Sequence, residues 1–490
     1  MHCDHDLIVI GGGSGGIGAA LAAARGGLSV LLLEKAPQLG GTAVRAGVCC
    51  WEMGAGGTGI PFDIYLRLKQ IPDAVGIYSI GRHGLWSGPE EERAFPGGES
   101  VIDPERGYID TLRRCGARSM AEDEEFVREH WHGVPFEPEV YARVVEEMLE
   151  ETGRCEVRKN APVIAAETDG LRLRSVTPAT GEKLSAPIFV DATGGASVAG
   201  MAGCRRLMGQ ESREGFDEPD APEKPNDQLN AVSLIYRVTP AMEETVEPLP
   251  DRIEQECWWR GSFPGAAVNH FPCGDLSVNM LPTMEGREAW EMGREAAYEE
   301  CRRRVRAHWH HFQTIYPEFR RYRLDWIAPE LGVRETHRTV ARYMLTEHDL
   351  LAGLSGQEHP DIIAVADHAM DTHGSPGGRS GCGELDEPYG IPYRCLLPRS
   401  LDNLLVACRG AGFSSLAASS CRLSRTMMQL GQAAGTAAAI AIEQNIAPPQ
   451  VPPEDLRTRL RTRHVQLEWP LRPQLAHYIR EQDAEARRSF

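Results

Sequence analysis

Three glycines and a glutamate near the start of the chain have the types and spacing that bind a dinucleotide. Gly11, Gly13 and Gly16 follow an apolar segment, and Glu34 comes 18 residues after Gly16. In such a turn the first glycine allows a tight bend, the second lets the backbone approach a pyrophosphate, and the third lets a helix pack closely on a strand. A carboxylate about 20 residues further on accepts hydrogen bonds from ribose hydroxyls and repels a 2′-phosphate. We therefore expect a bound dinucleotide other than NADP.

The residues around this motif supply the elements that must position it. Residues 6–10 (DLIVI) and 28–33 (LSVLLL) are apolar enough for buried strands, and an alanine-rich segment between them suits a helix. The N-terminal N–H groups of that helix would point at the phosphates. The pattern predicts an α/β fold that begins with a strand, a helix and a second strand. A fold of the same kind without a nucleotide is the alternative.

Composition limits the class of protein. The chain has 490 residues, of which 42% are hydrophobic, so we expect two or three domains with an ample core. A net charge of -18 argues against nucleic acid or an anionic membrane as a partner, because both would repel the surface. No apolar run suits a membrane span. The first strand leaves no room for a signal peptide, and thirteen cysteines without a CxxC pair do not suggest a disulfide framework, so we expect a cytoplasmic protein.

Further along, the chain divides into segments that differ in amino-acid composition and in hydrophobic pattern. A charged helix is expected at 138–151, followed by strand-like segments at 156–170, 171–179 and 183–195 that suggest a small antiparallel meander returning to the main sheet. The stretch from about 213 to 384 is richer in Trp, His, Arg and Pro and contains a long helical pattern near 287–312.

These pieces predict a discontinuous architecture. The expected fold is a Rossmann-type nucleotide-binding domain, with a parallel sheet and the small antiparallel meander, interrupted by an α+β substrate domain. We assign residues 1–80, 138–212 and 385–445 to the nucleotide-binding domain. The substrate or cap domain takes residues 81–137 and 213–384, and residues 446–490 form a C-terminal helical extension.

Several motifs together resemble one family. They are GGGSGG with LLLEK, GGT at 40–42, VDATGG at 190–195, and LDNLLVACRGAGFSSLAASSCRLSRTMMQLGQAAGTAAAIA near the C-terminus. This combination is similar to the bacterial FAD-dependent oxidoreductases, which belong to the glutathione-reductase and fumarate-reductase superfamily. The resemblance implies a Rossmann-type FAD-binding domain, FAD as the cofactor and an oxidoreductase activity. One departure is Cys408, where the family usually has glycine.

The resemblance also implies which residues hold FAD. The helix containing Gln432 and Ala433 is expected to point its positive N-terminal end at the flavin, which would stabilise the anionic reduced form. No histidine lies between Glu34 and Arg82, so FAD is expected to be non-covalent. The implied cofactor contacts are Gly11, Gly13, Ser14, Gly15, Gly16, Glu34, Lys35, Gly41, Thr42, Val163, Ala192, Thr193, Gly194, Gln432 and Ala433.

Catalytic residues are sought among groups that move protons or hold anions, since hydride transfer requires both. Arg334 lies in GVRETHR, and His373 lies in MDTHG, with Arg379 in the glycine-rich loop that follows. We expect His373 to transfer a proton and Arg334 to anchor the substrate or the flavin. Alternatively, Arg334 forms an ion pair between domains and His373 caps a turn. No metal site is predicted, because His308, His310 and His311 would point to different faces of a helix.

The expected function is hydride transfer between a small polar metabolite and flavin, with an electron acceptor and an oligomeric state that the sequence does not specify. The alternatives are an FAD-dependent C=C reductase and a flavin-binding accessory protein without turnover. Cys49 and Cys50 are expected to be ordinary thiols, although a redox role for them or for Cys408 stays open. A second glycine motif, Gly54, Gly56 and Gly59, is expected to be a loop, because a proline follows it. Stable NAD(P)H binding is therefore not predicted.

Overall fold

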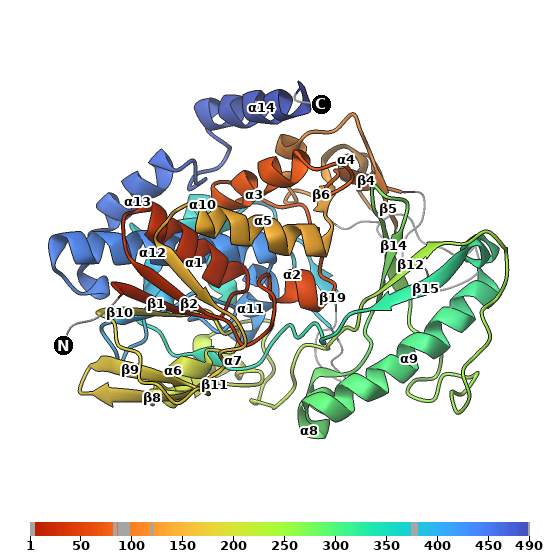
Figure 1. The fold of residues 1–490 in the computed structure, drawn as a ribbon, viewed down its shortest axis with the longest axis horizontal. Coiled ribbons are helices and arrows are strands. Elements are labelled where there is room, and N and C mark those ends of the chain that lie inside the picture. Colours follow the sequence, from red (N-terminus) through yellow and green to blue (C-terminus); the bar gives the residue numbers. More distant parts are fainter. Residues whose placement is uncertain (1–4, 82–85, 87–98, 119–121, 374–380, 489–490) are drawn as a thin grey trace.

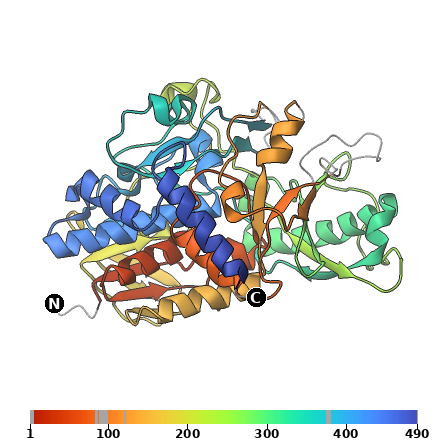
Figure 2. The same ribbon diagram turned by 90° about the horizontal axis from the view of Figure 1, so that it is seen from above.

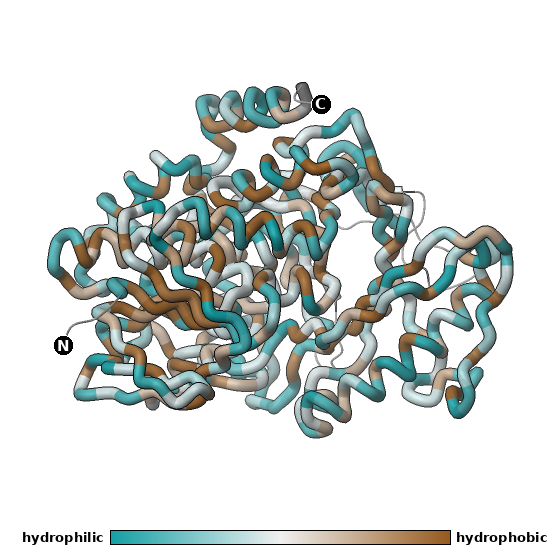
Figure 3. Tube along the Cα trace, viewed as in Figure 1, coloured by the Kyte–Doolittle hydropathy of each residue, from teal (hydrophilic) through white to brown (hydrophobic). Residues whose placement is uncertain are grey.

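A five-stranded parallel sheet forms the centre of the larger part of the molecule. The computed structural model describes residues 5–81, 86, 99–118, 122–373 and 381–488. The sheet order is β21-β10-β1-β2-β7, and every adjacent pair is parallel. Its three central strands are fully buried and appear as the brown strands at the left of Figure 3. The strands are β1 (Leu7–Ile10), β2 (Val30–Leu33), β7 (Cys155–Arg158), β10 (Ile188–Asp191) and β21 (Leu404–Val406).

Two helices made of small residues lie in backbone contact beside this sheet. Helix α1 (Ser14–Arg25) follows β1, and α12 (Ser424–Gln444) packs along it (Figure 1). A Cβ atom on Gly435 would lie 2.2 Å from the carbonyl oxygen of Ala19, so only glycine fits at this contact. The run of alanines in α12 is therefore explained by burial against α1. Helices α3 (Ile60–Lys69) and α5 (Pro138–Glu150) pack against each other next to this pair.

The other part of the molecule is built on an eight-stranded mixed sheet. Its order is β15-β12-β14-β13-β5-β4-β6-β3, and β13 and β5 are the parallel pair within it. This sheet and α9 lie to the right of the parallel sheet in Figures 1 and 2. The strands are β3 (Cys50–Trp51), β4 (Tyr78–Ile80), β5 (Glu99–Ile102), β6 (His132–Pro135), β12 (Tyr236–Pro240), β13 (Ala266–His270), β14 (Leu276–Met280) and β15 (Tyr322–Ile327).

The long helix expected near 287–312 is two helices. Helix α8 (Gly286–Met292) ends at Gly293, and α9 (Arg294–Ile315) begins directly after it. The expectation of one helix was wrong because Gly293 has a φ of 78°, which interrupts the helical backbone. The backbone therefore does not continue as one helix through this position.

The predicted meander is present, with one exception. Strands β8 (Val163–Asp169) and β9 (Arg172–Pro178) form an antiparallel hairpin, and Leu184 bridges to Val176 as a third segment. The preceding residues of the predicted meander instead form β7, which pairs parallel to β2 at the edge of the main sheet. The expected helix at 138–151 is α5, within one residue.

The loop at residues 52–59 is followed by a helix, contrary to expectation. Helix α3 starts at Ile60 and has Pro61 in its first turn, where a missing N–H costs nothing. The proline was therefore no argument against a helix. Within the described residues no helix is long and apolar enough to span a membrane.

Shorter elements complete the chain. The remaining strands are β11 (Arg206–Leu207), β16 (Arg338–Thr339), β17 (Ile362–Ala366), β18 (Met370–Thr372), β19 (Gly381–Gly383) and β20 (Tyr389–Pro392). The remaining helices are α2 (Thr42–Arg45), α4 (Glu124–His130), α6 (Ser197–Met201), α7 (Arg213–Phe216), α10 (Glu347–Gly356), α11 (Ser415–Cys421), α13 (Pro453–Thr462) and α14 (Pro473–Arg488).

Candidate functional site

The glycine turn, residues 11–16, is fixed by close backbone contacts. Gly11 has a φ of 101°, and a Cβ atom there would lie 2.5 Å from the carbonyl oxygen of Ala192, just after β10. A Cβ atom on Gly16 would lie 1.7 Å from the carbonyl oxygen of Gly11. The strand, the turn and α1 therefore meet at distances that exclude any side chain, and the first backbone N–H groups of α1 are left facing outward.

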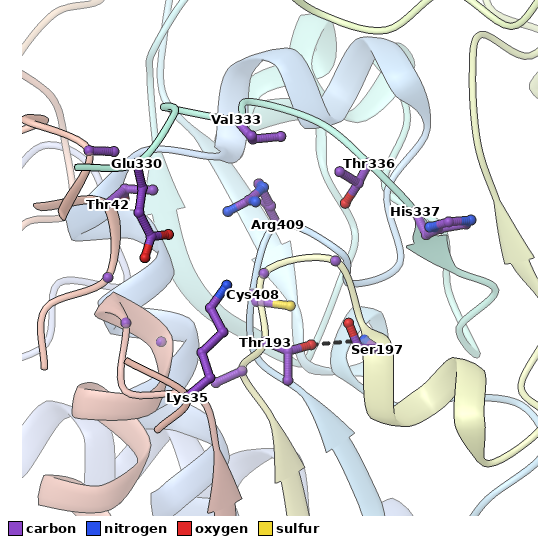
Figure 4. Close-up of a pocket in the computed structure, with 18 of the residues that line it drawn as sticks. Lys35, Thr42, Thr193, Ser197, Glu330, Val333, Thr336, His337, Cys408 and Arg409 are labelled. Carbon is purple, nitrogen blue, oxygen red and sulfur yellow. Dashed lines mark hydrogen bonds between the residues drawn. The ribbon is translucent and has the colours of Figure 1, made fainter. Parts of the chain in front are cut away.

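A cavity of about 1010 Å³ opens at this turn, at the carboxyl ends of β1, β2 and β10. Figure 4 shows Lys35, Thr42, Thr193, Cys408 and Arg409 around it. Twelve of the fifteen residues expected to contact a cofactor line this cavity. They are Gly11, Gly13, Ser14, Gly15, Glu34, Lys35, Gly41, Thr42, Val163, Ala192, Thr193 and Gly194.

The three others are placed in the packing behind the cavity. Gly16 is enclosed by the turn itself. Gln432 and Ala433 lie in the middle of α12 and are fully or almost fully buried, and Gln432 accepts a hydrogen bond from the backbone N–H of Ile60 at 3.1 Å. The N-terminal end of α12, at Ser424, does line the cavity.

The Glu34 carboxylate is held rigidly in the cavity wall. One oxygen accepts the backbone N–H of Gly12 at 2.5 Å, and the other accepts that of Ala36 at 2.7 Å. The side chain is only 6% exposed. Each carboxylate oxygen has a further lone pair, so the group can still accept hydrogen bonds from a ligand in the cavity.

Arg409 is a cavity residue that the sequence analysis missed. It makes no ion pair or hydrogen bond within the described residues, and its buried Nε has no partner. Its guanidinium lies over Gly194, where a Cβ atom would be 2.9 Å from a terminal nitrogen. Burial lowers the pKa of Arg409, but the group stays a cation at neutral pH. The available signal was its position three residues after β21, whose carboxyl end lies at the same sheet edge.

These features fit a bound dinucleotide. A wall of glycine backbone accepts a flat, extended ligand, a fixed carboxylate faces the place of a ribose, and an unpaired guanidinium supplies charge for a phosphate group. Cys408 lies beside Arg409 in this wall (Figure 4), and burial raises the pKa of its thiol to about 11. The thiol is therefore neutral at physiological pH.

A second group of charged residues includes Arg422, which also lines the large cavity. His373 Nε2 lies 2.6 Å from a carboxylate oxygen of Asp371, and Arg422 lies 3.0 Å from the same oxygen. Arg334 donates to the carbonyl of Ala231 at 2.8 Å. We call Glu52, Arg334, Asp371, His373 and Arg422 the charged cluster.

The backbone of one segment holds two members of this cluster in place. The N–H of His373 donates to the side-chain oxygen of Asn230 at 2.9 Å, and the carbonyl of His373 accepts from the N–H of Ala231 at 3.2 Å. Because Ala231 also binds Arg334, His373 and Arg334 are fixed relative to each other. Within the described residues Arg334 forms no ion pair, so the alternative of an ion pair between domains does not hold there.

The environment sets the protonation of these groups. Burial and the neighbouring charge of Arg422 lower the pKa of Arg334 to about 10, with Asp371 and Glu52 opposing the shift. Although burial acts the other way, the hydrogen bond from His373 and the charge of Arg422 hold the pKa of Asp371 far below its usual range. Burial lowers the pKa of His373, and Asp371 only partly offsets this. His373 is therefore a neutral imidazole at neutral pH, and Asp371 is ionised.

Other predicted groups lie elsewhere or outside the described residues. Arg379 is outside them. Cys49 and Cys50 are free thiols, and burial raises the pKa of Cys49 to about 12. His308 is buried between Tyr236 and the carbonyl of Pro264, and the described residues contain no group of metal-ligand side chains.

Comparison with known proteins gives one match over most of the chain. The family model described as FAD dependent oxidoreductase matches residues 6–460. A stretch of 111 residues is 33% identical to 3-oxosteroid 1-dehydrogenase of Mycobacterium tuberculosis, covering 22% of this chain and 16% of that protein. A stretch of 47 residues is 49% identical to 4-oxocyclohexanecarboxylate 2-dehydrogenase of Sinomonas cyclohexanicum, covering 10% of this chain and 8% of that protein. The chain thus matches only about a sixth of the length of the first of these relatives.

Solved structures of low sequence identity are also similar. One is a geranylgeranyl bacteriochlorophyll reductase-like protein from Thermoplasma acidophilum, with a TM-score of 0.45 and 13% identity over 99% of both chains. Another is iminodiacetate oxidase from Chelativorans sp. BNC1, with a TM-score of 0.41 and 14% identity over 92% of this chain and 98% of that one.

Proposed function

Because the chain belongs to the FAD dependent oxidoreductase family, we propose that it transfers a hydride between a small polar metabolite with an anionic group and non-covalently bound FAD. The chain is an FAD-dependent enzyme. The proposal concerns its substrate, the direction of its reaction and the roles of individual residues. An accessory role without turnover is disfavoured by the charged cluster, which carries a neutral imidazole suited to proton transfer.

The cavity residues would hold FAD along its length. The glycine turn and Arg409 would bind the pyrophosphate, and Glu34 would accept hydrogen bonds from the adenosine ribose. When bound, FAD accepts or donates a hydride, and this is the chemistry that the protein's own side chains cannot supply.

The arginines of the charged cluster would bind the substrate's anionic group. Asp371 pairs with Arg422, and the charges of Asp371 and Glu52 both act on Arg334, but neither carboxylate forms an ion pair with Arg334 within the described residues, so this guanidinium is available to an anion. Arg334 has donors left over, since its one hydrogen bond within the described residues goes to the Ala231 carbonyl. A carboxylate of a small metabolite would meet both guanidinium groups.

His373 would move the proton that accompanies hydride transfer. The contact of Nε2 with the ionised Asp371 places the imidazole proton on Nε2 and leaves the lone pair on Nδ1. Nδ1 would accept a proton when the substrate is oxidised and return one when it is reduced, while Asp371 stabilises the imidazolium. The observation that carries the proposal is this Asp371–His373 pair beside two arginines.

Replacement of the imidazole tests the assignment. We expect His373→Ala to lower kcat/KM for the identified substrate by roughly a hundredfold or more, because general acid–base catalysis contributes at least that much. FAD content and melting temperature should stay close to those of the wild type. His477→Ala, on an exposed face of α14, is the matched control and should leave kcat/KM unchanged. Wild-type turnover by His373→Ala would contradict the proposal.

A further inference from the structure

Glu52 presents a carboxylate oxygen that the proposed reaction does not use. Its Oε2 accepts from His368 Nε2 at 3.0 Å and from Arg114 at 3.3 Å. No described residue donates to Oε1. The Glu52 side chain is 48% exposed, although His368 and Arg114 beside it are almost fully buried. Glu52 and His368 both line a small cavity of about 50 Å³.

The charge around Glu52 is opposite to that around Arg334. Arg114 is already paired with Glu384 through two hydrogen bonds, of 2.9 and 2.6 Å, so its charge is largely matched before Glu52 is counted. Arg425 binds the Glu52 backbone carbonyl rather than the carboxylate, and Asp367 nearby adds a further negative charge. The three carboxylates at this wall, Glu52, Asp367 and Glu384, outnumber the guanidinium groups of Arg114 and Arg425, so the wall at Glu52 is negative, whereas the one at Arg334 and Arg422 is positive.

The two walls are neighbours. Ser424 lines both the large cavity and the small one. The charges of Asp371 and Glu52 both act on Arg334, which places the three groups within electrostatic range of each other. His368 and Asp371 stand three residues apart in the chain, so a single segment joins the two walls.

We propose that the substrate is a zwitterion, an amino acid or a related amine-bearing acid, whose carboxylate binds Arg334 and Arg422 and whose ammonium group binds Glu52. This inference rests on the proposed function and names its substrate class. A ligand with charges of both signs is the class that complements a positive wall and a negative wall at once. A 2-hydroxy acid would satisfy the arginines but would bring no cation to Glu52 Oε1, the oxygen to which no described residue donates.

The protonation of Glu52 agrees with this role. Burial by itself would raise the pKa of Glu52, but the hydrogen bond and charge of His368, together with Arg114, lower it to about 2. The carboxylate is therefore ionised at every pH at which the enzyme is expected to work.

The implied reaction is oxidation of a carbon–nitrogen bond, and its atoms and electrons balance. The C–H bond next to the nitrogen breaks, and the hydrogen leaves with both electrons to FAD. One N–H proton passes to His373 Nδ1, and a C=N bond forms. The substrate is oxidised by two electrons and FAD is reduced by two, and water can then hydrolyse the C=N product to a carbonyl compound.

The test compares matched ligands on the FAD-loaded enzyme without oxygen. L- and D-amino acids are titrated against the 2-hydroxy acids of the same side chain, with flavin absorbance and melting temperature as readouts of binding. In the wild type we expect at least one amino acid to bind about tenfold more tightly than its hydroxy counterpart. Glu52→Gln should remove that preference by weakening amino acid binding alone. Glu443→Gln, an exposed carboxylate on α12, should keep it.

Different failures separate this inference from the proposed function. Equal affinity for both ligand series in the wild type, or an equal loss for both in Glu52→Gln, would overturn the zwitterion. In either case the anion site would stand if Arg334→Lys weakens both series. If Arg334→Lys weakens neither series, the anion site fails, and the inference that rests on it fails too. Tighter binding of neutral polyols than of amino acids would also overturn the inference.

Discussion

The glycine turn and the charged cluster hold their ligand-facing groups in different ways. The turn uses backbone atoms from one short stretch, and adjacent carbonyls exclude any added Cβ atom. The charged cluster uses side chains from five positions between residues 52 and 422, each held by hydrogen bonds and ion pairs. Packing therefore fixes the turn, whereas charge balance fixes the cluster. Substitutions in the turn should damage the fold, and substitutions in the cluster should change chemistry or affinity.

The largest effect is expected from an added methyl group in the turn. In Gly15→Ala the new Cβ would lie 1.9 Å from the carbonyl oxygen of Ala407, a backbone atom that cannot move aside. We expect a loss of more than about 3 kcal/mol in the free energy of unfolding, together with loss of FAD. Urea unfolding and the flavin absorbance of the purified protein measure both.

Gly261→Ala is the matched control for this change. No atom lies within 4 Å of a Cβ atom built at Gly261, so the same methyl group should be tolerated there. If Gly15→Ala unfolds at the wild-type urea concentration and retains FAD, packing does not fix the turn, and the contrast between the two regions is lost.

A smaller effect is expected at Arg409. This residue lines the same cavity as the glycine turn, but it would bind the ligand through its side chain and not through its backbone. Arg409→Ala should weaken FAD binding about tenfold to a hundredfold, because a charged donor to a phosphate is removed. The apoprotein should not lose stability, since Arg409 has no partner within the described residues. Titration of apoprotein with FAD, followed by fluorescence, measures the Kd.

Arg213→Ala removes an exposed arginine on α7 and controls for overall charge. An Arg409→Ala protein with the wild-type Kd for FAD would mean that the unpaired guanidinium serves another ligand. An apoprotein that melts earlier than the wild type would mean that Arg409 supports the fold.

The same contrast explains what the sequence could predict. The turn, β1, α1 and β2 are local, so residue types and spacing identified them and the cavity they border. The charged cluster depends on contacts between distant segments, and no spacing rule indicates that Arg422 pairs with Asp371 or that the charge of Glu52 acts on Arg334. His373 and Arg334 were selected for their chemistry, but the segment at Ala231 that holds both of them was not foreseen.

Local sequence patterns also missed features that depend on a single backbone angle or on contacts between distant segments. The apolar pattern near 287–312 continues across Gly293, so it does not reveal the break that a φ of 78° introduces. Gly431 and Gly435, on either side of Gln432 and Ala433, pack α12 on the backbone of Gly15 and Ala19, a role that the sequence did not indicate, and the cofactor contact of Gln432 and Ala433 stays a prediction. Arg409 escaped notice because one arginine after a strand is common and its lack of a partner is visible only in three dimensions.

The smallest effect is expected from a charge change within the cluster, measured without turnover. Asp371 raises the pKa of His373, whereas burial and the charges of Arg334 and Arg422 lower it. In Asp371→Asn the opposing charge is lost, so the pKa of His373 should fall further below its ordinary value. NMR of protein labelled with ¹⁵N-histidine gives this titration directly, and His373→Ala identifies the resonance.

The direction of this shift decides how the cluster works. A buried imidazole with a lowered pKa stays neutral until the solution is more acidic than its ordinary titration range, so it can accept a proton at neutral pH. By the same linkage, the unfolded chain binds the proton more readily, so this histidine stabilises the fold above its unfolded pKa, and that contribution is lost as the pH falls. If Asp371→Asn instead raises the pKa of His373, the neighbouring arginines do not dominate the potential at the imidazole. The positive wall proposed to bind an anion would then lose its electrostatic basis, while the packing of the glycine turn would be untouched.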